Sequence, residues 1–148
     1  MKPLLTLVFC LMTILASAQA YHGTKSYPIY RQGAQRVSNY DDEGKEIVRI
    51  EYDLIFSKKV TYRDLSSDWE YTIVGFADDG VKDLDLKLFE WDDLLEQWTE
   101  VASDALEDNY PVMTYKPSVS AQYKIEVIVY SFHEGYSAAR YGLIIYHD

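Results

Sequence analysis

The sequence predicts an all-β protein, an antiparallel β-sandwich of about eight strands. Short segments in which apolar and polar residues alternate recur along the chain, and clusters of turn-forming residues separate them. The chain has 148 residues, 48% hydrophobic and 15% aromatic, which is enough to build one core despite a net charge of -10. We therefore expect one folded domain and no second one.

The first twenty residues have the features of a removable export signal. Lys2 gives a positive start, residues 4–16 are apolar, and small residues follow at Ala16, Ala18 and Ala20. The apolar stretch is shorter than the ~20 residues that a membrane span needs. We therefore predict a signal peptide over residues 1–20, cleaved after Ala18 or Ala20. The remaining chain should be secreted or periplasmic, with no membrane association after the signal is removed.

Residues 21–45 are polar, contain glycines and a proline, and show no steady hydrophobic period. They predict an N-terminal arm, loosely held against a domain formed by residues 46–148. The only cysteine, Cys10, lies within the predicted signal, so the exported chain has no disulfide.

The expected strands differ in how clearly they alternate. In the clearest, Leu84, Leu86 and Leu88 face one way and charged residues face the other. The segment 71–76 is apolar on both sides, which predicts a central strand. In the segment 48–56, apolar residues at even positions alternate with Arg49, Glu51 and Asp53, which is typical of a half-buried strand. The other expected strands are 60–65, 112–116, 123–130 and 141–146.

The segment 91–102 has two interpretations from its pattern alone. Its apolar residues have helical spacing, but they also fit a hairpin with its loop at residues 92–97. The pattern does not choose between them.

An apolar strand ends in an acidic loop at Gly75-Phe76-Ala77-Asp78-Asp79. The next strand begins with alternating aspartate and leucine, Asp83-Leu84-Asp85-Leu86. Asp108-Asn109-Tyr110-Pro111-Val112 and Tyr141-Gly142-Leu143 follow in the same order. These motifs resemble the bacterial pre-peptidase C-terminal (PPC) type domain, a small β-sandwich of jelly-roll character. The resemblance implies a hairpin at 91–102 and a secreted, non-catalytic accessory module. Such domains usually accompany exported enzymes, and some bind calcium, collagen or polysaccharide.

Most of the excess negative charge lies between residues 78 and 108. This segment has twelve acidic residues against Lys82 and Lys87, whereas the rest of residues 21–148 has twelve acidic and eleven basic ones. Calcium takes six to eight oxygen ligands, which clustered carboxylates can supply. Asp78, Asp79, Asp83 and Asp85 are therefore the candidate metal ligands, with calcium as a possible cofactor. The alternative is an acidic surface that keeps an exported protein soluble.

The charge also excludes partners. The net acidic charge argues against a nucleic-acid partner, because phosphate binding requires a basic face. The three histidines form no zinc-binding pair, the serines lie in no nucleophile motif, and no catalytic residue is identified. We therefore expect no enzyme, and a partner that is an extracellular protein or a polysaccharide. Two alternatives stay open: a calcium-stabilised adhesion or polysaccharide-binding module, and a small hydrolase that uses a carboxylate pair.

Aromatic residues offer the other candidate surface. Phe89 and Trp91 lie opposite the face formed by Leu84, Leu86 and Leu88, so they are candidates for exposure and for stacking on sugar rings. Packing against a loop of the core is the competing interpretation.

Overall fold

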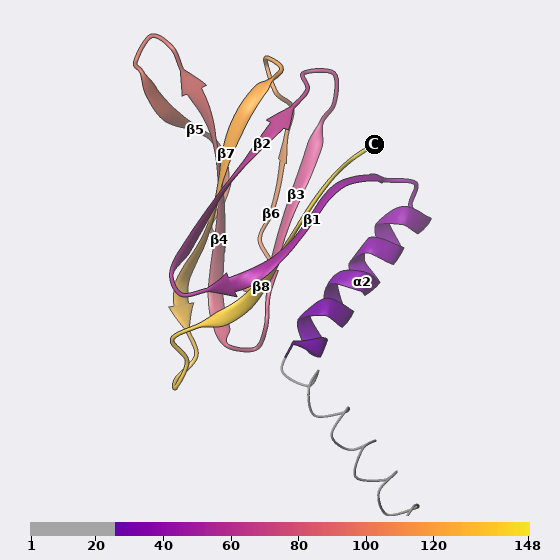
Figure 1. Cartoon of the computed structure of the whole chain (residues 1–148), viewed down its shortest axis with the longest axis vertical. Helices are drawn as coiled ribbons and strands as arrows, with labels where there is room; N and C mark the ends of the chain where they lie inside the picture. The colour runs from indigo at the N-terminus through magenta and orange to yellow at the C-terminus, as the bar shows by residue number, and fades with distance from the viewer. Residues whose placement is uncertain (1–25) are drawn as a thin grey trace, which may run out of the picture.

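The computed structural model describes residues 26–148, and the predicted signal peptide lies outside them. The described chain forms one helix and eight strands (Figure 1). Their bounds are α2 Tyr27–Asp42, β1 Glu46–Ile55, β2 Lys58–Leu65, β3 Tyr71–Ala77, β4 Val81–Asp92, β5 Gln97–Asp104, β6 Val112–Tyr115, β7 Ala121–Phe132 and β8 Ala139–His147. Within this part of the chain, no helix has the length and hydropathy that a membrane crossing requires.

The strands form two four-stranded antiparallel sheets that pack face to face. The first sheet has the order β1-β8-β3-β6 and the second has the order β2-β7-β4-β5. Consecutive strands β1 and β2 lie at the edges of different sheets, so the chain crosses the sandwich between Ile55 and Lys58. The all-β sandwich predicted from the sequence is confirmed.

The core lies between the two sheets, and the alternating strands fill it as predicted. Leu84, Leu86 and Leu88 of β4 are fully buried there, opposite Ile73 of β3. From β7, Tyr123, Ile125 and Val127 point into the same core. The chain has no disulfide in this region, so packing of apolar side chains is the main source of stability.

The segment after Glu90 forms a hairpin and not a helix. Strands β4 and β5 pair from Leu86–Asp104 outward to Asp92–Gln97, with Trp91 opposite Trp98. The hairpin that the family resemblance implied is therefore correct.

The prediction of an irregular arm over residues 21–45 is wrong where the structure describes it, because residues 27–42 form helix α2. Pro28 lies in its first turn, where a proline costs no hydrogen bond. The helix contacts the first sheet along one face, with Ile29, Gly33, Val37 and Tyr40 at spacings of three and four residues. A glycine in this stripe hides the hydrophobic period, so the sequence shows no clear amphipathic helix.

Helix α2 covers the outer face of the first sheet (Figure 1). Val74 and Phe76 of β3 and Ile144 of β8 are buried beneath it, together with Ile29. Strand β3 is thus central and apolar on both sides, as predicted, because the core buries one side and the helix buries the other.

Strand β1 differs from its predicted orientation. A bulge between Ile47 and Arg49 shifts its register: Val48, at the bulge, packs against the core, and Ile55 enters the core at the end of the strand. The predicted apolar face instead carries Tyr52, which lies against α2, and the partly exposed Ile50. Glu51 points between the sheets and accepts a hydrogen bond of 2.9 Å from the Tyr141 hydroxyl.

Candidate functional site

The outer face of the second sheet carries a connected set of aromatic side chains. Tyr62 of β2 is paired with Lys124 of β7, and Lys124 is paired with Phe89 of β4, so one row crosses three strands. Trp91 and Trp98 form the next pair, across β4 and β5. We call these five residues the aromatic strip. In the part of the chain that the structure describes, no helix covers this face.

The rings of the strip contact one another. The centroids of Trp91 and Trp98 lie 5.6 Å apart at an interplanar angle of 72°, an edge-to-face arrangement. Tyr62 reaches Trp98 at 5.7 Å. Tyr62 and Trp91 nevertheless remain 48% and 44% exposed, so the strip presents aromatic surface to solvent.

Lys124 fixes the middle of the strip. Its ammonium lies 3.9 Å from the Phe89 ring centroid and 5.6 Å from that of Trp98. It also pairs with Glu126 at 3.0 Å, and Lys58 approaches the same carboxylate at 3.2 Å. Burial opposes ionisation of Glu126, but the hydrogen bonds from the two lysines outweigh it and lower the carboxyl pKa. The strip is therefore held in place before any ligand binds.

The sequence identified two members of this strip, Phe89 and Trp91, as candidates for exposure. It missed Trp98, Tyr62 and Lys124. Trp98 could be found only after the hairpin was chosen, and Tyr62 only from the pairing of β2 with β7, which joins segments some sixty residues apart.

The four candidate calcium ligands do not lie together. Asp78 and Asp79 line a depression of about 460 Å³ between the start of α2 and the turn after β3. Asp83 and Asp85 line a separate depression of about 410 Å³ beside Glu107. Among residues 26–148, no group of three or more His, Cys, Asp or Glu side chains is arranged to hold a metal ion.

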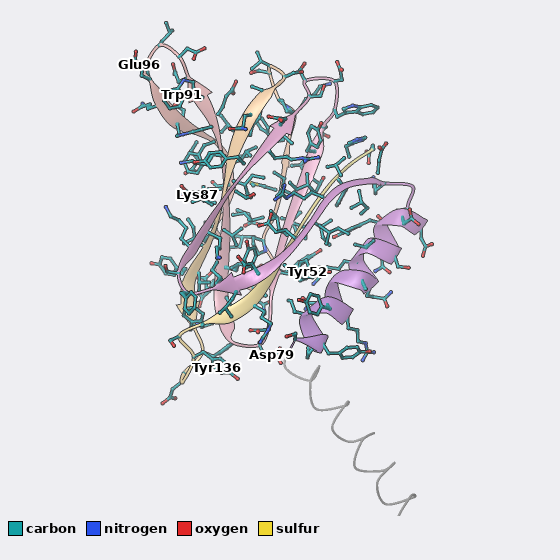
Figure 2. All side chains as sticks on the ribbon, viewed as in Figure 1. Tyr52, Asp79, Lys87, Trp91, Glu96 and Tyr136 are labelled. Carbon is teal, nitrogen blue, oxygen red and sulfur yellow. The ribbon has the colours of Figure 1, made fainter. Side chains whose placement is uncertain are left out.

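Asp78 has a structural role that explains its place in the motif. Its Oδ1 accepts a hydrogen bond of 3.0 Å from the Gly80 amide, and its Oδ2 accepts one of 2.9 Å from the Arg140 amide. The side chain thereby joins the β3–β4 turn to β8. Asp79, beside it, is exposed and lies near Tyr136 at the end of the molecule away from Trp91 (Figure 2).

Asp83 is the most unusual of the four carboxylates. Its side chain is buried, and its Oδ1 has no hydrogen-bond partner. Burial raises the pKa of Asp83, and the carboxylate of Glu107 adds to the rise. Burial, followed by the charge on Asp83, also raises the pKa of Asp85. Calcium binding stays a prediction for this pair, and the hydrolase alternative, for which the sequence named no residues, stays open.

Comparisons with known proteins were consistent with these observations. No family model and no curated protein matches the chain. Among solved structures, it is similar to the pre-peptidase C-terminal domain of a collagenase from Bacillus anthracis, with 12% identity over 66% of this chain and 87% of that one, at a TM-score of 0.49. The Yersinia pseudotuberculosis-derived mitogen matches at 12% identity over 68% of this chain and 85% of that one, at a TM-score of 0.50.

A third similar structure is PliG from Aeromonas hydrophila, a periplasmic inhibitor of g-type lysozyme. It has 8% identity over 72% of this chain and 90% of that one, at a TM-score of 0.47. The sequence motif resembled the PPC type, and a PPC domain is among the solved structures to which the chain is similar. At these identities the similarity extends to the fold and no further.

Proposed function

We propose that this protein is an exported, non-catalytic binding module that holds a neutral polysaccharide on its aromatic strip. The observation that supports the proposal is the cross-strand pair of Trp91 and Trp98, continued by Tyr62 on an uncovered sheet face. Tryptophan and tyrosine combine a flat apolar face with a polar edge, which suits them to wet interfaces. The apolar faces of sugar rings can stack on such side chains.

The charges around the strip favour a neutral polymer. Glu100, opposite Phe89 in the register of the hairpin, pairs with Lys87 at 2.8 Å, and Lys124 pairs with Glu126 at 3.0 Å. Because these charges are paired with one another, the face attracts neither anionic nor cationic chains strongly, and its paired groups can still exchange hydrogen bonds with sugar hydroxyls. Export is inferred from the predicted signal peptide, and the role as an accessory module is inferred from the PPC-like fold.

Intrinsic tryptophan fluorescence tests the proposal, because two of the three tryptophans belong to the strip. The full chain is titrated with cellohexaose, xylohexaose and chitohexaose, and the emission maximum and intensity are followed. We expect a saturable change with at least one of them. The Trp98→Ala variant should lose binding at least tenfold, because it removes the ring that contacts both Trp91 and Tyr62.

Trp69→Ala is the matched control. Trp69 is also partly exposed, but it stacks on His147 with ring centroids 4.4 Å apart, away from the strip. Its substitution should leave the affinity unchanged. Equal affinities of the Trp98→Ala variant and the unmodified protein would contradict the assignment of the strip. No response to any of the three oligosaccharides would remove neutral β-linked polysaccharides of these types as ligands.

A further inference from the structure

The β4–β5 hairpin ends in two leucines whose side chains are mostly exposed. Leu94 is 95% exposed, the highest value of any large hydrophobic side chain in residues 26–148, and Leu95 is 62% exposed. Single exposed leucines are common on protein surfaces, but two adjacent ones at the apex of a projecting hairpin form a compact apolar tip. Figure 1 shows this hairpin extending beyond the rest of the sandwich.

The loop that carries the leucines is ordered. Oδ1 of Asp92 accepts hydrogen bonds from the amides of Leu94 at 2.8 Å and Leu95 at 3.0 Å. Glu96 closes the loop with φ +50°, a left-handed conformation that is unfavourable for a residue with a side chain. The leucines are thus displayed on a preformed loop, which lowers the entropy lost when a partner binds.

The hairpin beyond Lys87 carries acidic side chains and no basic one. No lysine or arginine occurs between Lys87 and Lys116, whereas the hairpin itself carries Glu90, Asp92, Asp93, Glu96 and Glu100. In the ion pairs found among the described residues, Asp92, Asp93 and Glu96 take no part. Their charge is therefore available to a partner.

This charge selects the kind of partner. A second copy of the chain presents the same acidic tip and has a net charge of -10, so self-association through the tip is opposed. An anionic lipid surface is opposed for the same reason. A basic protein with an apolar pocket satisfies both features, because it pairs with the acids and buries the leucines.

We propose that the apex of the β4–β5 hairpin, residues 92–97, is a docking site for a basic exported protein that receives Leu94 and Leu95 in an apolar pocket. The acidic side chains around the leucines set the orientation and the rate of encounter, and the leucines supply most of the contact area. The tip and the aromatic strip share no residue: Glu96 lies at the apex, and Trp91 lies just below it on the same hairpin (Figure 2).

The test places a photo-crosslinking amino acid at position 94 of the full chain, in cells that export it. The control places the same group at Phe56, which is 63% exposed in the connection between β1 and β2. We expect one protein of basic isoelectric point to be captured at position 94 and not at position 56. Capture of an acidic protein, or equal capture at both positions, would overturn the proposal.

The captured protein is then purified, and its affinity for the unmodified chain and for variants is measured by titration calorimetry. We expect Leu94→Ser/Leu95→Ser to weaken binding at least tenfold. Asp93→Asn/Glu96→Gln should weaken it and reduce its dependence on salt, while Phe56→Ser should have no effect. These positions are exposed, so the variants should fold normally.

Two results would refute the inference. One is an affinity that Leu94→Ser/Leu95→Ser leaves unchanged. The other is leucine-dependent binding to vesicles of neutral phosphatidylcholine in place of the captured protein, which would make a lipid surface the partner. Oligosaccharide binding by the tip variants should be retained, so failure here is distinguishable from failure of the aromatic strip.

Discussion

The contact between Gly33 of α2 and Tyr52 of β1 allows a quantitative test of how the helix is seated. A Cβ atom placed on Gly33 would lie 2.0 Å from the Tyr52 hydroxyl oxygen and 2.8 Å from Cζ. Ordinary van der Waals contact begins near 3.4 Å, so the ring edge would have to retreat by more than 1 Å. Tyr52 is held between Tyr30 and Phe76, with ring centroids 4.9 Å and 6.1 Å away.

Two opposing effects set the expected size of the change in Gly33→Ala. Replacing glycine by alanine inside a helix stabilises it by about 1 kcal/mol. Overpacking a filled contact costs about 1–3 kcal/mol. Because Tyr52 is confined by two other rings, we expect the second effect to dominate, with a net loss of about 1 kcal/mol in the free energy of unfolding.

A double-mutant cycle separates the two effects. In a Tyr52→Leu background the obstructing ring is absent, so Gly33→Ala should stabilise the protein by about 1 kcal/mol, giving a coupling energy of about 2 kcal/mol. Urea unfolding followed by circular dichroism measures all four corners, and the m-value should stay constant. If Gly33→Ala stabilises the unmodified protein as much as the Tyr52→Leu variant, the helix does not pack on Tyr52 as described.

Two other predictions concern Asp83. Its pKa is raised in the folded state, so ionisation above the unfolded value of 3.8 destabilises the fold. In the presence of EDTA, Asp83→Asn should therefore raise the free energy of unfolding by about 1 kcal/mol at pH 7. At pH 3, where the carboxyl group is protonated, the variant should lose this gain. An equal gain at both pH values would contradict the effect of burial on the charge. Millimolar calcium should raise the melting midpoint of the unmodified protein by mass action. The Asp83→Asn variant should not show this rise, whereas the control Asp79→Asn should. A midpoint that calcium does not change would contradict calcium binding.

The sequence predicts this fold well wherever one face of a strand enters the core. The two-residue period survives over residues 84–88 of β4 and 123–129 of β7, because each inward position of these segments is filled by an apolar side chain and no bulge interrupts them. It predicts β1 poorly, because a bulge after Ile47 changes which positions point inward, and a bulge leaves no mark in the hydrophobic pattern. It fails for α2, whose packed face is completed by Gly33 and by Arg36.

Arg36 explains why hydrophobic periodicity in the sequence does not reveal helix α2. Its guanidinium lies 3.7 Å from the ring centroid of Tyr110, so a charged residue occupies a packed position on the helix. A search for aliphatic residues at helical spacing counts both Gly33 and Arg36 as interruptions. The contact is visible only when the loop that carries Tyr110 is in place.

The site was predictable in part for a geometric reason. Trp91 and Trp98 are seven residues apart, so they share a face in a helix and also pair in a hairpin with a four-residue loop. In a helix they would lie about two turns apart, so only the hairpin brings their rings into contact and adds Trp98 to the predicted residues Phe89 and Trp91. The candidate calcium ligands, by contrast, required the β3–β4 turn to bring its acids to one side, and Asp78 instead binds the backbone of β8 through Arg140.

The two outer faces of the sandwich are covered differently, and the sequence of β3 already implies that its own sheet is covered. A strand in a two-layer sandwich buries one side, so the additional apolar residues Val74 and Phe76 require a third layer. Gly142 of β8 lies under Phe76, where a Cβ would be 2.2 Å from the ring, so the neighbouring strand leaves room for the ring beneath α2. The outer face of the first sheet therefore has the shape that α2 needs in order to pack on it. The second sheet has aromatic residues outward but only partly buried, which is the arrangement expected of a face that binds another molecule.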